Sequence, residues 1–183
     1  QWIEARETEL LPVPYFHVVF TLPDELNTLA LHQPKIVYDA LFKAAWQTIE
    51  AFTGKNNKPG MISILHTWGQ NLSLHPHVHC IIPGGFVTPN DVWKLSKNQG
   101  KFLFPVKAMS RVYRAKYVAL LKASVLEVHQ TIYDSLFKKE WVVYAKRPFG
   151  TPASVVEYLG RYTHKIAISN HRIISMDDLT ITI

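Results

Sequence analysis

The chain has 183 residues, of which 48% are hydrophobic and 12% aromatic, and its formal net charge is +6 at neutral pH. This composition excludes a disordered chain, because it offers enough apolar surface to bury a core. A single cysteine, Cys80, excludes an internal disulfide, and no apolar run approaches the roughly 20 residues of a transmembrane helix. The basic balance is compatible with a polyanionic partner.

The first half of the chain predicts two strands separated by a helix. Residues 16–22 are mostly β-branched and aromatic, as in a buried strand, and we assign His17 within this run to local packing. Apolar residues recur at helical spacing over residues 34–52, and residues 61–68 predict the second strand.

The second half mixes helices and strands without strict alternation. The sequence predicts a loop-like insertion over residues 86–105, one long helix over 110–137, a strand over 141–145 and a helix over 151–163, with short strands after it. This order predicts an α+β fold whose sheet is mainly antiparallel and carries helices.

The segment Leu-His-Pro-His-Val-His-Cys-Ile-Ile at residues 74–82 predicts a strand with two different faces. Because side chains alternate along a strand, His75, His77 and His79 share one face and apolar residues share the other. Next neighbours on one face lie about 6.6 Å apart, so two imidazoles can converge on one ion or one phosphate. The alternative is a run of histidines without a role, but the apolar face favours a rigidly held site.

Two tyrosines four residues apart, Tyr158 and Tyr162, lie on one face of the predicted helix. Core packing with hydroxyls at the rim is the alternative interpretation. Gly160 between them lowers helix stability by about 1 kcal/mol relative to alanine. We therefore expect either that another group approaches the helix closely at this position or that the helix bends there. The neighbouring basic residues suit a phosphate backbone, and they are Arg161, His164 and Lys165. A phenol is a poor nucleophile at neutral pH and becomes useful beside a metal ion that polarises the phosphate.

These motifs resemble those of a known superfamily. His77-Val78-His79 resembles the His-hydrophobic-His motif of HUH endonucleases, and Tyr158-x-x-x-Tyr162 resembles the paired tyrosines of their two-tyrosine branch. The framing segments 11–23, 65–80 and 157–170 resemble bacterial rolling-circle insertion-sequence transposases. The resemblance covers most of the chain, and the motifs occur in the family's order.

The resemblance implies an HUH fold, with the histidine strand in the middle of the sheet and helices packed on it. It also implies a divalent ion, Mg²⁺ or Mn²⁺, bound by His77 and His79. His66 on the partner strand is our first choice for a third ligand, and Gln70 is the second. Mg²⁺ prefers oxygen ligands, so a histidine-rich site suits Mn²⁺ at least as well.

The implied reaction is the cutting and rejoining of single-stranded DNA at transposon ends. Tyr158 or Tyr162 would attack a phosphodiester, giving a 5′-phosphotyrosine link and a free 3′-OH, and the second tyrosine would serve another cleavage or the strand transfer. The basic residues would hold the DNA backbone, and they are Arg161, His164 and Lys165. No nucleotide cofactor and no membrane are implied, and the expected location is the bacterial cytoplasm near the nucleoid.

We expect residues 1–183 to form a single catalytic domain. Family members typically carry a cysteine-rich zinc-binding segment before this region and continue beyond it, so we interpret the chain as an excised piece that retains nicking and rejoining. Two alternatives stay open. One is a histidine-triad nucleotide hydrolase or transferase that uses His75, His77 and His79, and the other is a non-catalytic basic DNA-binding domain.

Overall fold

The structure is a computed structural model. It describes residues 10–69, 72–97, 103–124 and 126–146, together with residues 149, 154–155, 157–158, 160, 175–176 and 181–182. The prediction of a single domain over residues 1–183 therefore stays a prediction.

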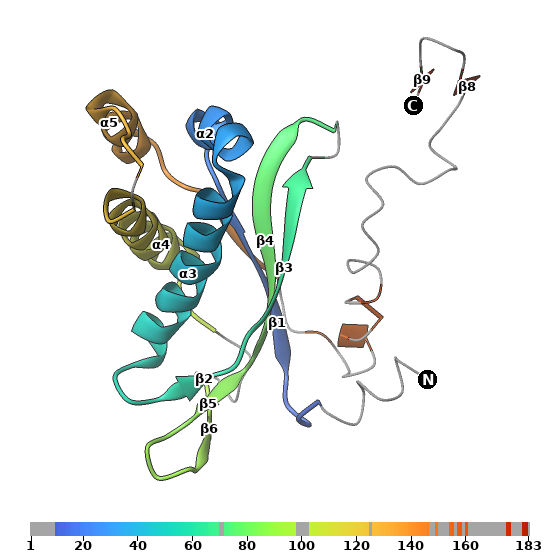
Figure 1. The fold of residues 1–183 in the computed structure, drawn as a ribbon. Helices are drawn as coiled ribbons and strands as arrows, with labels where there is room; N and C mark the ends of the chain where they lie inside the picture. The colour runs from blue at the N-terminus through green and yellow to red at the C-terminus, as the bar shows by residue number, and fades with distance from the viewer. Residues whose placement is uncertain are drawn as a thin grey trace.

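A four-stranded sheet organises the described part of the chain (Figure 1). Its strands are, in spatial order, β3 (Ile62–Trp68), β4 (Leu74–Pro83), β1 (Tyr15–Thr21) and β7 (Val143–Lys146). Every neighbouring pair is antiparallel. The predicted α+β class is confirmed, and the histidine strand β4 lies in the interior of the sheet with β3 and β1 on either side.

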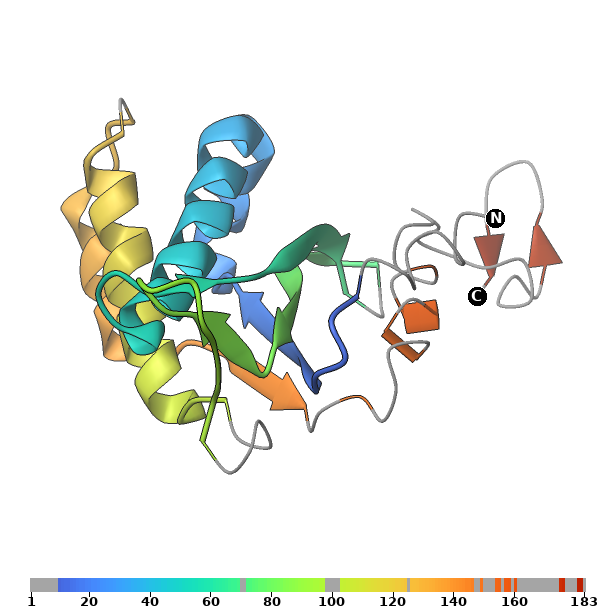
Figure 2. The same cartoon turned by 90° about the horizontal axis from the view of Figure 1, so that it is seen from below.

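Helices cover one face of this sheet, as Figures 1 and 2 show. The two long ones are α3 (Pro34–Thr53) and α4 (Val106–Lys122). Proline at the first position of α3 has a backbone angle already suited to a helix. The alternate residues Val18, Phe20, Val78 and Cys80 pack into the core beneath the helices. The histidines of β4 consequently lie on the opposite face.

Smaller helices flank the two long ones. They are the 3₁₀ turn η1 (Asp24–Leu26), α2 (Asn27–His32) and α5 (Gln130–Lys138). None of the described helices combines the length and the apolar character that a bilayer crossing requires.

The single helix predicted over residues 110–137 is wrong, because the structure divides it. The helix α4 ends at Lys122, and α5 begins after His129, whose side chain caps it by accepting the Thr131 N–H. Both helices present apolar residues such as Leu121 and Leu136 to one core, so the apolar pattern runs on past the break.

The insertion predicted as a loop over residues 86–105 contains two short strands. They are β5 (Gly85–Val87) and β6 (Trp93–Leu95), and β5 also pairs with β2 (Lys58–Pro59). A separate pair joins β8 (Ser175–Met176) to β9 (Ile181–Thr182). Within the predicted helix over 151–163, the described residues 154, 155, 157, 158 and 160 are helical.

Two glycines differ in the space around them. A Cβ on Gly85 would lie 2.5 Å from the Lys94 carbonyl oxygen and 2.5 Å from the Trp93 ring. Apart from its chain neighbours and its own helix backbone, no described residue has an atom within 4 Å of the position that a Gly160 Cβ would take, so the structure shows no close approach at that position.

We expect opposite effects from alanine at these two sites. Gly85→Ala should lower the free energy of unfolding by about 1 to 3 kcal/mol, because the β5–β6 backbone must move apart. Gly160→Ala should raise it by up to about 1 kcal/mol, because alanine favours helix. Urea denaturation measures both values. Equal stability of the two variants would contradict the packing described around Gly85.

Candidate functional site

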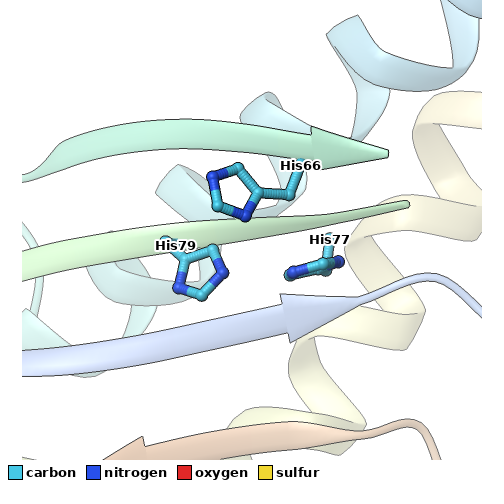
Figure 3. Close-up of side chains that lie close together, drawn as sticks. All are labelled: His66, His77 and His79. Atoms are coloured by element: carbon cyan, nitrogen blue, oxygen red, sulfur yellow. The ribbon is translucent and has the colours of Figure 1, made fainter. Parts of the chain in front are cut away.

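Three histidines gather on the face of the sheet opposite the long helices (Figure 3). His77 and His79 are two residues apart on β4 and therefore share a face, and His66 on β3 lies directly opposite His77 in the strand register. The potential ligand atoms of the three side chains all lie within 4.8 Å of one another. This cluster could hold one metal ion.

Neighbouring groups fix the orientation of these rings. Nδ1 of His77 lies 2.6 Å from the backbone oxygen of His75, so this nitrogen donates its N–H and leaves the Nε2 lone pair for a ligand. The His66 ring stacks on Trp68 at 5.6 Å between centroids. Within the described residues, His75 thus contributes a carbonyl to the cluster and does not belong to the group of potential ligands.

Burial favours the uncharged form of His77 and His79. It lowers the pKa of His79 to about 3, with a further contribution from His77, His66 and His17. Burial also lowers the pKa of His77. At neutral pH these imidazoles are therefore neutral, which is the form that binds metal ions. The donor set fits a divalent transition-metal ion.

The hydroxyl of Tyr158 reaches the same cluster from a distant part of the chain. It lies 2.9 Å from Nδ1 of His79 and 2.6 Å from Nε2 of His17. Its ring packs beside that of Phe149, at 5.3 Å between centroids. The fully buried Val155 contacts the sheet one helical turn before Tyr158, and this contact anchors the segment.

His17 belongs to this site, although the sequence indicated only local packing. Its ring is parallel to that of His79 at 5.0 Å, and its Nε2 lies 2.8 Å from Nδ1 of His79. The pKa of His17 is lowered to about 4. Burial is the main cause, and electrostatic repulsion from Lys146 and His77 lowers this pKa further. A polar side chain within an apolar strand, such as His17, needs a buried hydrogen-bond partner. This requirement could have indicated from the sequence that His17 contacts other polar groups of the site.

The structure therefore brings together His66, His77, His79 and Tyr158 from the predicted site, and it adds His17. The other predicted site residues lie outside the described residues, and they are Gln70, Arg161, Tyr162, His164 and Lys165.

Comparison with known proteins gives one family and several relatives. The family model described as "Putative transposase" matches residues 60–183. "Putative transposase y4qJ" of Sinorhizobium fredii (strain NBRC 101917 / NGR234) is 37% identical over 198 residues, covering 97% of this chain and 50% of that protein. "Transposase for insertion sequence element IS801" of Pseudomonas savastanoi pv. phaseolicola is 29% identical over 189 residues, covering 94% and 44%. The chain spans about half the length of these relatives.

Solved structures of the relaxase TrwC show a more distant similarity. A complex with a 27-mer DNA comprising the recognition hairpin and the cleavage site has 16% identity and a TM-score of 0.47, covering 62% of this chain and 46% of that chain. A metal-bound complex with oriT DNA has the same identity and TM-score and covers 63% and 46%.

The lowered pKa values predict that acid destabilises the metal-free protein. The unfolded chain binds protons near the ordinary histidine pKa of 6.5, whereas His17 and His79 resist protonation down to about pH 4 and 3. The free energy of unfolding should therefore fall below pH 6.5, by about 1.4 kcal/mol per pH unit for each histidine.

Urea denaturation between pH 7 and pH 5 in EDTA measures this slope. His17→Gln should make the slope shallower, because it removes one of the two histidines whose pKa burial lowers most. Identical slopes in His17→Gln and the parent protein would contradict the burial argument.

Proposed function

The chain belongs to the transposase family whose model matches its residues 60–183, and on that premise we propose that it cuts and rejoins single-stranded DNA through a covalent phosphotyrosine link. The membership confirms the resemblance to transposases that the sequence motifs indicated. The main support for the covalent step is the Tyr158 hydroxyl, 2.9 Å from a histidine of the candidate metal cluster. By analogy with the insertion-sequence relative, we propose DNA at the ends of a mobile element as the substrate.

We assign the metal site to His66, His77 and His79. Three imidazoles suit Mn²⁺ and other transition metals, whereas Mg²⁺ prefers oxygen. A divalent ion bound there would neutralise charge on the scissile phosphate and stabilise the charge that develops during attack. The third histidine of this cluster is His66 from the neighbouring strand β3, whereas the histidine-triad alternative requires His75. The cluster therefore favours the transposase reaction over that alternative.

Tyr158 is the proposed nucleophile. His17 and His79 hold its hydroxyl by hydrogen bonds, and Nε2 of His17 is placed to accept the phenolic proton as the oxygen–phosphorus bond forms. An approaching phosphodiester favours protonation of His17 and offsets the effect of burial on its pKa. The bond to the 3′ oxygen breaks, and this oxygen takes up a proton to become the free 3′-OH.

Rejoining reverses these steps. The 5′-phosphotyrosine link conserves the energy of the broken bond, so a 3′-OH can attack it without a nucleotide cofactor. We propose that Tyr162 serves a second cleavage or the strand transfer. Backbone contacts are assigned to Arg161, His164 and Lys165, as the family resemblance implies.

Metal binding should follow the three histidines. Mn²⁺ should raise the melting temperature of the parent protein, because a ligand that binds only the folded state stabilises it. His66→Ala/His77→Ala should abolish this increase, and His75→Ala on the same strand face should retain it. Differential scanning fluorimetry measures the shift. An undiminished Mn²⁺ effect in the double variant would place the ion elsewhere.

Covalent capture of DNA should require the tyrosine pair. With Mn²⁺ and a labelled single-stranded oligonucleotide, the parent protein should form an adduct that survives a denaturing gel. Tyr158→Phe/Tyr162→Phe should form none, because phenylalanine has no attacking oxygen. Tyr38→Phe, on the helical side of the molecule, should form it normally.

An adduct in the double variant would refute the assigned nucleophiles. Retarded DNA without any adduct of the parent protein, whatever the metal, would instead indicate a non-catalytic DNA-binding domain.

A further inference from the structure

A basic groove lies away from the histidine cluster, between α4 and the segment that joins α5 to β7. Its volume is about 500 Å³. Five cationic residues and one acidic residue line it, namely Lys107, Arg111, Arg114, Lys138, Lys139 and Glu140. Such an excess of positive charge around a hollow suits a polyanionic ligand.

Two of these cations form the frame of the groove. Arg114 donates to the backbone oxygens of Phe137 and Lys139 at 3.3 and 2.9 Å, and its guanidinium lies over the Phe137 ring at 5.0 Å. Lys139 pairs with Glu25 at 2.7 Å. These contacts fix the end of α5 and hold an aromatic ring at the groove, 48% exposed.

The other three cations face solvent. Lys107, Arg111 and Lys138 are exposed, and among the described residues the structure gives them no ion pair. Their charges are therefore available to a ligand from outside. Cations next to an exposed aromatic ring are typical of sites that bind single-stranded nucleic acids. The cations contact the phosphates and the ring stacks with a base.

The edge strand β7 connects this groove to the histidine face. Figure 2 shows β7 at the border of the sheet, next to α4. Val142, just before β7, lines the groove and is 62% exposed, and Tyr144 two residues later is 54% exposed. Tyr144 pairs with Val19, which in turn lies opposite His79.

Residues directly opposite in a sheet point to the same face, so Tyr144 is on the face of the histidines. Two strand spacings separate it from His79, about 10 Å. Lys146 shares that face, because it pairs with His17. The Tyr144 ring thus lies between the cluster and the groove, and Lys146 lies farther along β7, level with His17.

We propose that single-stranded DNA leaves the histidine cluster across β7, stacks a base on Tyr144, and continues into the groove, where Lys107, Arg111 and Lys138 bind its phosphates. This inference rests on the proposed function for the identity of the nucleic acid. It assigns the groove as a second contact region for the same strand, beyond the cleaved bond.

The test compares oligonucleotide lengths in a variant that does not cleave. In a Tyr158→Phe/Tyr162→Phe background, fluorescence anisotropy measures the affinity for oligo-dT of about 6 and about 16 nucleotides, lengths within the range of known single-strand sites. The groove variant is Lys107→Glu/Arg111→Glu. Its matched control is Lys43→Glu/Lys55→Glu, which changes the net charge equally at exposed positions outside the groove.

We expect the groove variant to weaken binding of the long oligonucleotide on the order of tenfold relative to the short one. The slope of log affinity against log salt concentration for the long oligonucleotide should decrease in magnitude by about 1.4, because two phosphate contacts are lost. The charge-matched control should keep the parent's dependence on length. Tyr144→Ala should weaken binding of both lengths, and Tyr144→Phe should restore it because the ring still stacks.

Equal weakening by the groove variant and its control would overturn the proposal, because net charge alone would then explain the effect. Equal weakening of short and long oligonucleotides by the groove variant would overturn it as well. The comparison of oligonucleotide lengths measures binding alone and does not depend on cleavage. If the proposed function is wrong, the parent protein binds DNA but forms no adduct, which is a separate result.

Discussion

The pairing of β4 with β3 and β1 is the constraint on which the whole site depends. It places His66 opposite His77 and brings the His17 ring alongside that of His79. Because side chains alternate with a period of two, a slip of one residue would turn His77 and His79 into the core and expose Val78 and Cys80. The apolar face of β4, buried under α3 and α4, makes such a slip costly and so fixes where the imidazoles point.

Burial has two consequences at this site. It costs free energy to bury polar rings, and the contacts among His17, His79 and Tyr158 offset part of that cost. It also keeps the imidazoles neutral, which preserves the lone pairs that a metal ion needs. The same burial that makes the folded protein less stable in acid therefore keeps the imidazole nitrogens free of protons and able to bind a cation.

Local patterns predicted the parts of the fold that depend on local sequence. The alternation over residues 74–82 identified β4 and its two faces, and His66 was expected on the partner strand. The helix break after Lys122 escaped prediction because apolar spacing continues across it. The role of His17 depends on which strands become neighbours, and no local pattern encodes that. Tyr158 lies 79 positions from His79, and only the family resemblance implied that they meet.

The Tyr158 hydroxyl should lie beside a metal ion held by the histidine cluster, and fluorine NMR tests this placement most directly. In protein labelled with 3-fluorotyrosine, loss of one resonance in Tyr158→Phe identifies the signal of residue 158. One equivalent of Mn²⁺ should broaden this resonance strongly through its unpaired electrons and leave the Tyr38 resonance sharp. A Tyr158 resonance as sharp as that of Tyr38 in the Mn²⁺-bound protein would contradict the account.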